Sequence, residues 1–381
     1  MYELTILNHE GEQITTTLYV FLKNGESIQL KDFRPFKIAD VEEKDIDYIQ
    51  IKAFALGFWR HAQNAPPSGA TIRLQRIDQT GPLGWWHLAH GITSSDINRG
   101  QNIRIGVIDL CLEIDESLQH IKNLGQMDPQ GQLKEMNIAE HPHGRYCCSL
   151  LANKQTEDGG FEGISPGSEI FFIGAMDETD VSRLNPLQVA TAVLTLSRDY
   201  QCDIINISAG DLDKKPQFLL SVILQARKNG TVIVVAGGND NKKLKYPAGF
   251  AEVVTAVALG KKGACPPSSP GYEHEQSQQA IDIDDTYYYW PNNDYGENVD
   301  YIAAGAGIID TLDQTPNVDI YGTSYASPML CGILAAKLSN NSTYHSCNRD
   351  ISRVTLALDE LRSTSIPLEL GDNMKFNIPV L

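Results

Sequence analysis

The first part of the chain alternates apolar and polar residues over short stretches that end in polar turns. Alternation at period two predicts half-buried β-strands, because successive side chains of a strand point to opposite faces. We therefore expect a small, β-rich, sandwich-like N-terminal domain over residues 1–80. For Ala53–Ala62 a helix is an open alternative, which would make this domain mixed α/β. The predicted strands are Tyr2–Leu7, Thr15–Leu22, Ser27–Leu30, Tyr48–Phe54 and Thr71–Ile77.

From about residue 80 the pattern changes to apolar, β-branched runs separated by longer helical segments. Runs that are apolar on both faces are typical of parallel strands buried between helices. Residues 81–381 are thus predicted to form an α/β domain, with a doubly wound, mostly parallel sheet and helices on both faces. The predicted strands are Ile103–Ile108, Ile170–Ile173, Ile204–Ile207, Val232–Ala236 and Val253–Ala258. The predicted helices are His143–Ala152, Pro186–Asp199, Gln217–Asn229 and Tyr325–Leu338.

Lys261–Asn298 interrupts this pattern with a polar, turn-rich stretch, which predicts a surface insertion near residues 262–292. Its aromatic run Tyr287–Trp290 either contacts a peptide or anchors the insertion. The nearby acidic side chains are expected to be solvated, because the spacing of an EF-hand calcium loop is absent. We expect no cofactor, and a structural calcium remains an alternative. The acidic residues in question are Asp282, Asp284 and Asp285.

Composition limits the partners and the compartment. With 31 basic and 48 acidic residues, the chain carries a formal charge of −17. Such a surface repels phosphate backbones and anionic head groups, so neither nucleic acid nor a membrane is expected as a partner. The 7 cysteines are odd in number and several lie in apolar runs, which predicts buried free thiols in a reducing compartment. The N-terminus lacks the pattern of a secretion signal, so a cytoplasmic location is expected.

Four polar side chains lie at the ends of predicted elements. Asp109 follows a buried strand, at the edge where open α/β sheets bind ligands. His143 opens a helix, and Ser324 precedes an apolar helix, where a serine is first of all an N-cap. Asn239 follows another strand through two glycines. Acyl transfer needs a nucleophile, a base, an orienting carboxylate and a donor for the oxyanion, and these four residues supply such groups.

Around these residues the chain resembles the subtilisin-like serine protease family (peptidase S8). The resemblance extends from about residue 82 to the C-terminus, and the order Asp, His, Ser is that of subtilisin. The serine block is highly specific by itself, and all the blocks stand in register. They are Ile105–Asp109, His143–Ala152, Gly163–Pro166, Ile204–Gly210, Val234–Asn239, Tyr246–Ala248, Asp294–Gly305 and Gly322–Ala336.

The resemblance implies a serine endopeptidase that cleaves protein or peptide substrates through an acyl-enzyme. Asp109, His143 and Ser324 would form the triad, with His143 as the base. Asn239 and the backbone N–H of Ser324 would stabilise the oxyanion. The walls of the substrate pocket would be Ser208, Ala209 and Gly210 on one side and Ala236, Gly237 and Gly238 on the other.

Departures from the family keep a rival interpretation open, a catalytically silent subtilisin-fold protein with a binding or scaffolding role. Leu110-Cys111 follows the aspartate where the family usually has Thr or Ser and then Gly. Arg145 follows His143-Gly144 where the family usually has Thr. Cys147-Cys148 on the same helix is interpreted as core packing, and a His141–His143 metal site is not expected.

The N-terminal region raises a separate question, because many relatives carry a propeptide that is cleaved after folding. The strand-rich pattern of residues 1–80 predicts a domain that stays attached. A protease in the cytoplasm has to be restrained, and we expect the insertion or this N-terminal domain to limit access to Ser324. A regulatory protein partner is a further candidate for this restraint.

Overall fold

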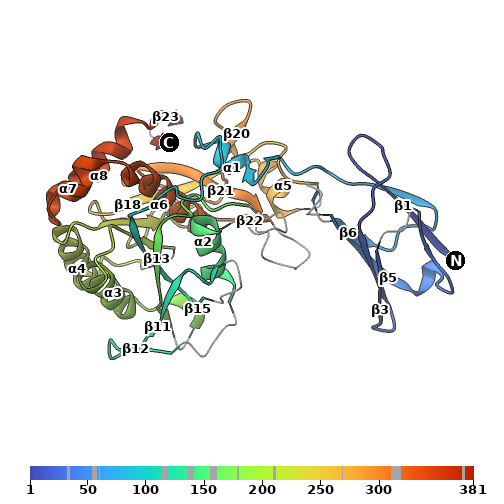
Figure 1. The fold of residues 1–381 in the computed structure, drawn as a ribbon, viewed down its shortest axis with the longest axis horizontal. Helices are drawn as coiled ribbons and strands as arrows, with labels where there is room; N and C mark the ends of the chain where they lie inside the picture. The colour runs from blue at the N-terminus through green and yellow to red at the C-terminus, as the bar shows by residue number, and fades with distance from the viewer. Residues whose placement is uncertain are drawn as a thin grey trace.

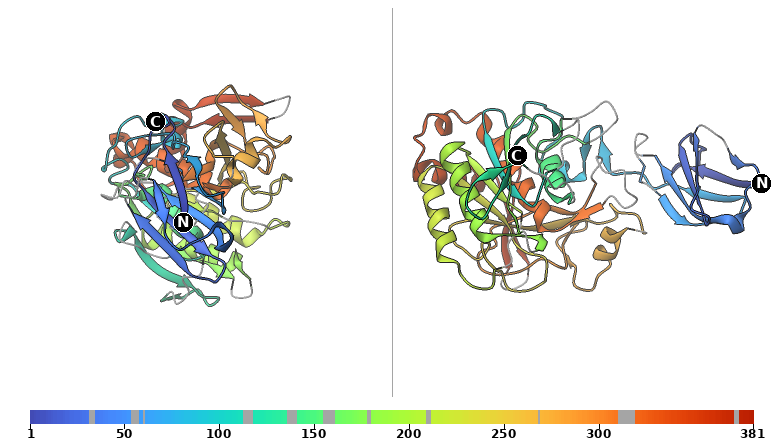
Figure 2. Two further views of the ribbon diagram at one scale, coloured as in Figure 1. Left: turned by 90° about the vertical axis from the view of Figure 1, so that its right-hand side faces the viewer. Right: turned by 90° about the horizontal axis from the view of Figure 1, so that it is seen from below.

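A computed structural model describes residues 1–31, 35–53, 58–59, 61–112, 118–135, 141–154, 161–177, 180–208, 212–267, 269–309, 319–370 and 374–381. A small β-rich region, which holds the N-terminus, stands beside a larger α/β body in Figure 1. In the right-hand view of Figure 2 the β-rich region projects from one end of the body.

The N-terminal region consists of two sheets that share one apolar core. Its strands follow the predicted alternation: in β1 every second residue is buried, and Leu4, Val20 and Ile49 meet in the same cluster. The sheet orders are β4-β1-β7 and β3-β2-β5-β6. The bounds are β1 (Tyr2–Leu7), β2 (Thr17–Leu22), β3 (Ser27–Lys31), β4 (Phe36–Ile38), β5 (Ile46–Lys52), β6 (His61–Asn64) and β7 (Ala70–Arg73), with a short 3-10 turn at Glu43–Asp45. The β-rich prediction is confirmed.

The alternative of a helix over Ala53–Ala62 falls partly on residues 54–57 and 60, which lie outside the described residues. In the described remainder, Phe58 forms an antiparallel bridge with Arg76, and β6 begins at His61. This part of the segment is therefore extended.

The body is built on one large sheet whose central strands are parallel. Its path is β12-β11-β13-β10-β16-β17-β18-β21-β24-β23, and the end pairs of this path, β12 with β11 and β23 with β24, are antiparallel. Off the path, β20 pairs antiparallel with β18, and β22 with β21. The fold-class prediction is confirmed. The bounds are β10 (Arg104–Asp109), β11 (Lys122–Met127), β12 (Leu133–Lys134), β13 (Glu169–Gly174), β16 (Ile204–Ile207), β17 (Val232–Ala236), β18 (Val254–Lys261), β21 (Tyr301–Ile309), β23 (Ile366–Leu370) and β24 (Met374–Ile378).

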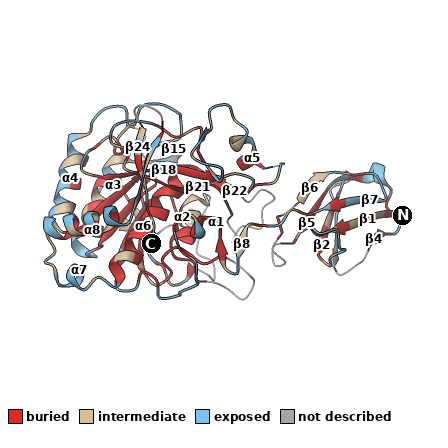
Figure 3. Cartoon of the chain, turned by 90° about the horizontal axis from the view of Figure 1, so that it is seen from above, coloured by how far each residue is buried: buried red, intermediate tan, exposed pale blue. Residues whose placement is uncertain are grey.

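Both faces of this sheet are covered, which explains why its strands are apolar throughout. In β17, Val234 packs in the cluster that contains α2 and α6, whereas Ile233 packs in the cluster that contains α3 and α4. Figure 3 shows the strands buried, with exposed residues on the outer surfaces of the helices. The helices are α1 (Trp85–Leu88), α2 (His143–Ala152), α3 (Pro186–Leu194), α4 (Gln217–Lys228), α5 (Pro270–Glu275), α6 (Thr323–Ser339), α7 (Ser342–Ser346) and α8 (Ile351–Ser363).

The predicted helix Pro186–Asp199 consists of α3 followed by a π-helical turn at Thr195–Asp199. Asn185 caps α3 by accepting hydrogen bonds from two backbone N–H groups, and a proline at the first helical position suits this start.

None of the described helices has the combination of length and apolar character that crossing a bilayer requires. The remaining short strands are β8 (Gln79–Thr80), β9 (Leu83–Gly84), β14 (Met176–Asp177), β15 (Asp180–Leu184), β19 (Ile281–Asp282), β20 (Tyr287–Tyr289) and β22 (Asp319–Tyr321).

The insertion is less superficial than its composition predicts. Strand β20 pairs antiparallel with β18, so the insertion extends the main sheet. Tyr288, Tyr289 and Trp290 are only 2%, 5% and 2% exposed, and they therefore anchor the insertion in the body. Of the acidic residues, Asp282 pairs with Lys262, and Asp284 accepts hydrogen bonds from two backbone N–H groups of its own turn.

The cysteines are free thiols, as predicted. Six are buried, and Cys347 is partly exposed. Burial raises the pKa of Cys202 and of Cys331, which keeps these thiols protonated and unreactive.

Candidate active site

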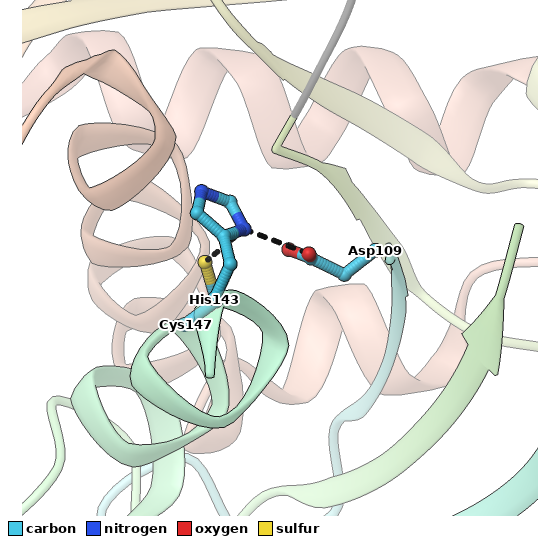
Figure 4. A group of neighbouring side chains, drawn as sticks. All are labelled: Asp109, His143 and Cys147. Atoms are coloured by element: carbon cyan, nitrogen blue, oxygen red, sulfur yellow. Dashed lines mark hydrogen bonds and ion pairs between the residues drawn. The ribbon is translucent and has the colours of Figure 1, made fainter. Parts of the chain in front are cut away.

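Asp109 is the last residue of β10, and its side chain is 1% exposed. Its Oδ1 accepts a hydrogen bond from the imidazole Nδ1 of His143 at 2.7 Å and one from the backbone N–H of Leu110 at 2.7 Å. Figure 4 shows the imidazole turned toward this carboxylate. Among the described residues, no group donates to the buried Oδ2.

His143 is the first residue of α2, and its side chain is 19% exposed. Burial lowers the pKa of this imidazole, but the charge of Asp109 and the hydrogen bond to it raise the pKa by more, so the net shift is upward. Because Asp109 accepts from Nδ1, the neutral ring carries its proton there, and Nε2 is left as the basic nitrogen. His143 is thus suited to accept a proton from a neighbouring group.

Ser324 is the second residue of α6 and is 9% exposed. The chain reaches it through Gly322, whose φ of 136° lies in a region that favours glycine. The Ser324 hydroxyl donates to the carbonyl oxygen of Ser208 at 2.9 Å. In the described part of the chain no hydrogen bond joins this hydroxyl to His143. The structure thus pairs Asp109 with His143 and places Ser324 on α6, which packs against α2.

A proline inside α6 determines how the first turn of this helix is held. Pro328 has no N–H, so the carbonyl of Ser324 four residues earlier lacks its helical hydrogen bond. The Ser208 hydroxyl donates to this carbonyl at 3.0 Å, and the Cys147 thiol donates to it at 3.4 Å. The amide of Asn206 in turn donates to the Ser208 hydroxyl at 2.6 Å. Residues of β16, α2 and α6 are therefore tied together directly behind the serine.

Cys147 is more closely involved with the site than the core-packing interpretation implies. Its Sγ lies 4.0 Å from Nδ1 of His143, one helical turn earlier (Figure 4). Burial and the nearby charge of Asp109 raise the pKa of this thiol well above its ordinary value, so it is a poor nucleophile. Asp109, His143 and Cys147 are also the described group whose ligand atoms are close enough to hold a metal ion, whereas His141 is not part of it.

Asn239 follows β17 and stands beside the start of α6. Its Oδ1 accepts hydrogen bonds from the backbone N–H and from the hydroxyl of Thr323, both at 2.9 Å. Asn239 is exposed, and within the described part of the chain nothing accepts from its Nδ2, so this amide can donate to a ligand. The N–H of Ser324 lies in the first helical turn, where N–H groups have no intrahelical acceptor and the helix dipole favours negative charge. Both predicted oxyanion donors thus lie at the N-terminal end of α6, Ser324 within the helix and Asn239 in contact with Thr323.

The two predicted pocket walls extend from neighbouring strands, because β16 and β17 are parallel and paired. Ser208 is buried, and on the other side Ala236 ends β17 and Gly237 and Gly238 follow it. Ala209 and Gly210 of the first wall lie outside the described residues. Beyond that wall, Asp213 lies 3.8 Å from Lys245.

A family comparison agrees with this geometry: the model of the family described as "Subtilase family" matches residues 100–357. The chain belongs to the subtilase family. Among its relatives, "Minor extracellular protease Epr" of Bacillus subtilis is 26% identical over 220 residues, covering 56% of this chain and 33% of the relative. "Major intracellular serine protease" of the same organism is 23% identical over 288 residues, covering 73% of this chain and 81% of the relative.

A solved structure titled "Crystal structure of a cold adapted subtilisin-like serine proteinase" matches with a TM-score of 0.53 and 16% identity. The match covers 74% of this chain and 90% of that structure, and it supports the subtilisin-like fold. The match covers only about a third of Epr. Membership of the family therefore does not by itself give this chain the activity of that longer relative.

The departures of this subtilase from its family leave the contact between Asp109 and His143 in place. Cys111 donates its thiol to the carbonyl of His141 at 3.1 Å, which ties the segment after β10 to the start of α2. The guanidinium of Arg145 lies 5.2 Å from the ring centre of Tyr146 and is partly buried. Neither side chain occupies the place of a predicted catalytic group.

Proposed function

We propose that this subtilase is a serine endopeptidase that hydrolyses peptide bonds through an acyl-enzyme. The observation that carries the proposal is the 2.7 Å hydrogen bond between the buried Asp109 and His143, in a chain of this family. Ser324 at the start of α6 supplies the nucleophile. The reaction draws on these side chains and on water, so the proposal assigns no cofactor.

In the first step, the Ser324 hydroxyl leaves the carbonyl of Ser208 by rotation about χ1 and turns toward His143. His143 Nε2 takes the hydroxyl proton while Oγ bonds to the substrate carbonyl carbon. Asp109 holds the imidazole in this tautomer and stabilises its protonated form. The tetrahedral intermediate then expels the amine, which receives the proton from His143.

In the second step, water attacks the acyl-enzyme and His143 again takes a proton. The second tetrahedral intermediate collapses, the carboxylic acid leaves, and the proton returns to Ser324. In both steps the negative charge develops on the former carbonyl oxygen. Asn239 Nδ2 and the N–H of Ser324 would stabilise this charge, since donors fixed before the reaction cost no reorganisation.

The substrate would be a protein or peptide. Its backbone would pair with the segment that begins at Ser208, as an added strand, and the side chain before the scissile bond would lie between this segment and Ala236–Gly238. A cytoplasmic location and retention of residues 1–80 belong to the same proposal. A relative named "Major intracellular serine protease" supports the location. The proposal excludes nucleic-acid and membrane partners, and it leaves the restraint of activity to the insertion, the N-terminal region or a regulatory protein.

One observation favours the rival function, a binding protein without turnover. The Ser324 hydroxyl is hydrogen-bonded to Ser208 rather than to the imidazole. A peptide-library digestion separates the two functions: the wild type should release peptides with new termini at a consistent sequence, and Ser324→Ala should release none. Equal cleavage by both proteins would assign the activity to a contaminant, and cleavage by neither would support the binding protein.

A further inference from the structure

The loop that carries Asn239 is joined to a segment that directly follows the insertion. Residues 238–244 lie against residues 292–296, and Lys243 forms a parallel bridge with Tyr295. Backbone hydrogen bonds run in both directions between the two segments. They are Asn241 N to Asn292 O (3.0 Å), Asp294 N to Gly238 O (3.0 Å), Tyr295 N to Lys242 O (2.8 Å) and Leu244 N to Tyr295 O (2.9 Å).

Asp294 stands at the centre of this contact and is 3% exposed. Its Oδ1 accepts hydrogen bonds from the backbone N–H groups of Asp240 and Lys242, both at 2.9 Å. Its own N–H donates to the carbonyl of Gly238. Asp294 therefore holds the backbone on both sides of Asn239.

Gly238 makes this arrangement sterically specific. Its φ is 117°, and a Cβ at this position would lie 2.3 Å from Oδ2 of Asp294. Only glycine permits the carboxylate to approach the chain so closely. The same residue donates its N–H to the hydroxyl of Thr323 at 3.0 Å, which links the loop to the start of α6.

The Asn239 amide is thus fixed from two sides. Thr323 holds its Oδ1, and Asp294 holds the backbone from which the side chain extends. An oxyanion donor contributes in proportion to how well it is placed before the reaction. Hydrogen bonds to a carboxylate are stronger than those between neutral groups, and here two of them converge on one oxygen.

We propose that Asp294 is a positioning residue for the oxyanion site: it sets the direction of the Asn239 amide without touching the substrate. This inference rests on the proposed function, in which Asn239 stabilises the oxyanion. It also gives the segment after the insertion a role, because residues 292–296 connect the insertion to the catalytic loop.

The test is steady-state hydrolysis of a short cleavable peptide by the full chain and its variants. Asp294→Ala should lower kcat by about 10²-fold, the loss that a displacement of roughly 1 Å produces, with KM nearly unchanged. The double variant Asp294→Ala/Asn239→Ala should be no slower than Asn239→Ala, since both changes remove the same donor. Asp294→Asn keeps an acceptor oxygen for both N–H groups and should restore most of the turnover.

Asp300→Ala is the matched control. Asp300 is a partly buried carboxylate, whose Oδ2 accepts from the backbone N–H of Thr255 at 2.9 Å, in a different part of the sheet. Its loss should lower stability without a selective loss of kcat. If Asp294→Ala does not fold, Asp294→Glu replaces it, because one added methylene displaces the carboxylate while the charge is kept.

The outcomes separate the inference from the function on which it rests. A large loss of kcat in Asn239→Ala with normal kcat in Asp294→Ala, or in Asp294→Glu, would overturn the positioning role alone. Additive losses in the double variant would also overturn it. Unchanged kcat in Asn239→Ala would instead contradict the oxyanion role in the proposed function.

Discussion

At the scale of single residues, the imidazole of His143 is subject to two opposing influences. Burial disfavours its protonated form, whereas the charge of Asp109 and the hydrogen bond to it favour that form and prevail. The pKa of His143 is therefore higher than the ordinary value of about 6.5. A general base must be unprotonated, so we expect turnover to fall as the pH drops through this raised pKa.

Asp109→Asn tests this relation. The neutral amide removes the attraction that raises the pKa of His143, so the acid limb of the kcat/KM profile should move to lower pH. At the optimum, kcat should fall by about 10⁴-fold, because the amide no longer selects the reactive tautomer. The measurement is a pH–rate profile of both proteins. An unchanged acid limb would mean that another group controls it.

Asn239→Ala probes the oxyanion donor directly. Turnover should fall by about 10²–10³-fold with a smaller change in KM, since the hydrogen bond strengthens as the oxyanion forms. Steady-state kinetics on a short peptide measure both constants. Asn229→Ala, after α4, is the control and should behave as the wild type. Equal changes in KM and kcat at Asn239 would show that the side chain shapes the pocket instead.

The positions of Asp109, His143, Ser324 and Asn239 in the fold could be predicted because each ends, follows or opens an element that the hydrophobic pattern defines, and their catalytic roles stay a prediction. Cys147 could not be predicted as a partner of the site, since a buried cysteine on a helix reads as core. Cys147 donates to the carbonyl of Ser324, which lacks its helical hydrogen bond because of the proline four residues later, and that proline was the signal in the sequence.

At the scale of elements, the start of α6 depends on groups outside the helix. Pro328 has no N–H to donate to the carbonyl of Ser324. Ser208 and Cys147 donate to this carbonyl instead. The proline thus directs this end of α6 toward β16 and α2. Helices α2 and α4 follow the predicted bounds because their apolar period is regular. The insertion departs from its predicted surface position. Pairing of β20 with β18 buries its aromatic residues, although the residues around them in the sequence are polar.

Ser208→Ala tests the support of this helix start. The change leaves the Asn206 amide without its acceptor and the Ser324 carbonyl with the thiol alone. The free energy of unfolding should fall by about 1–3 kcal/mol, and kcat should fall with it. Urea denaturation and peptide kinetics measure the two effects. Ser339→Ala, which loses a hydroxyl bond at the other end of α6, should lose stability without a comparable loss of kcat. The same loss of kcat in both variants would contradict a specific role of Ser208.

At the scale of the whole molecule, the β-rich region has its own core and is joined to the body at the insertion. The indole N–H of Trp59 donates to the carbonyl of Ala264 at 3.1 Å, and Asp78 pairs with Lys261. The N-terminal region thus contacts the segment that leads to β20 and on to residues 292–296.

Retention of residues 1–80 is a prediction at this scale. The intact mass of the active protein should correspond to a chain that includes them, because their core and the contact through Trp59 give a stable folded unit. Mass spectrometry of samples taken during activation provides the measurement. Loss of about 80 N-terminal residues in step with a gain of activity would identify them as a propeptide.

The central claim is that Ser324 is an activated nucleophile, and covalent labelling with a fluorophosphonate tests it most directly. Reaction requires a serine whose proton a neighbouring base can accept, so an ordinary surface serine does not react. We predict one label on each wild-type molecule, located at Ser324 by peptide mapping, slower labelling in Asp109→Asn, and none in Ser324→Ala. A folded wild-type protein that stays unlabelled, or a label at another residue, would contradict this account.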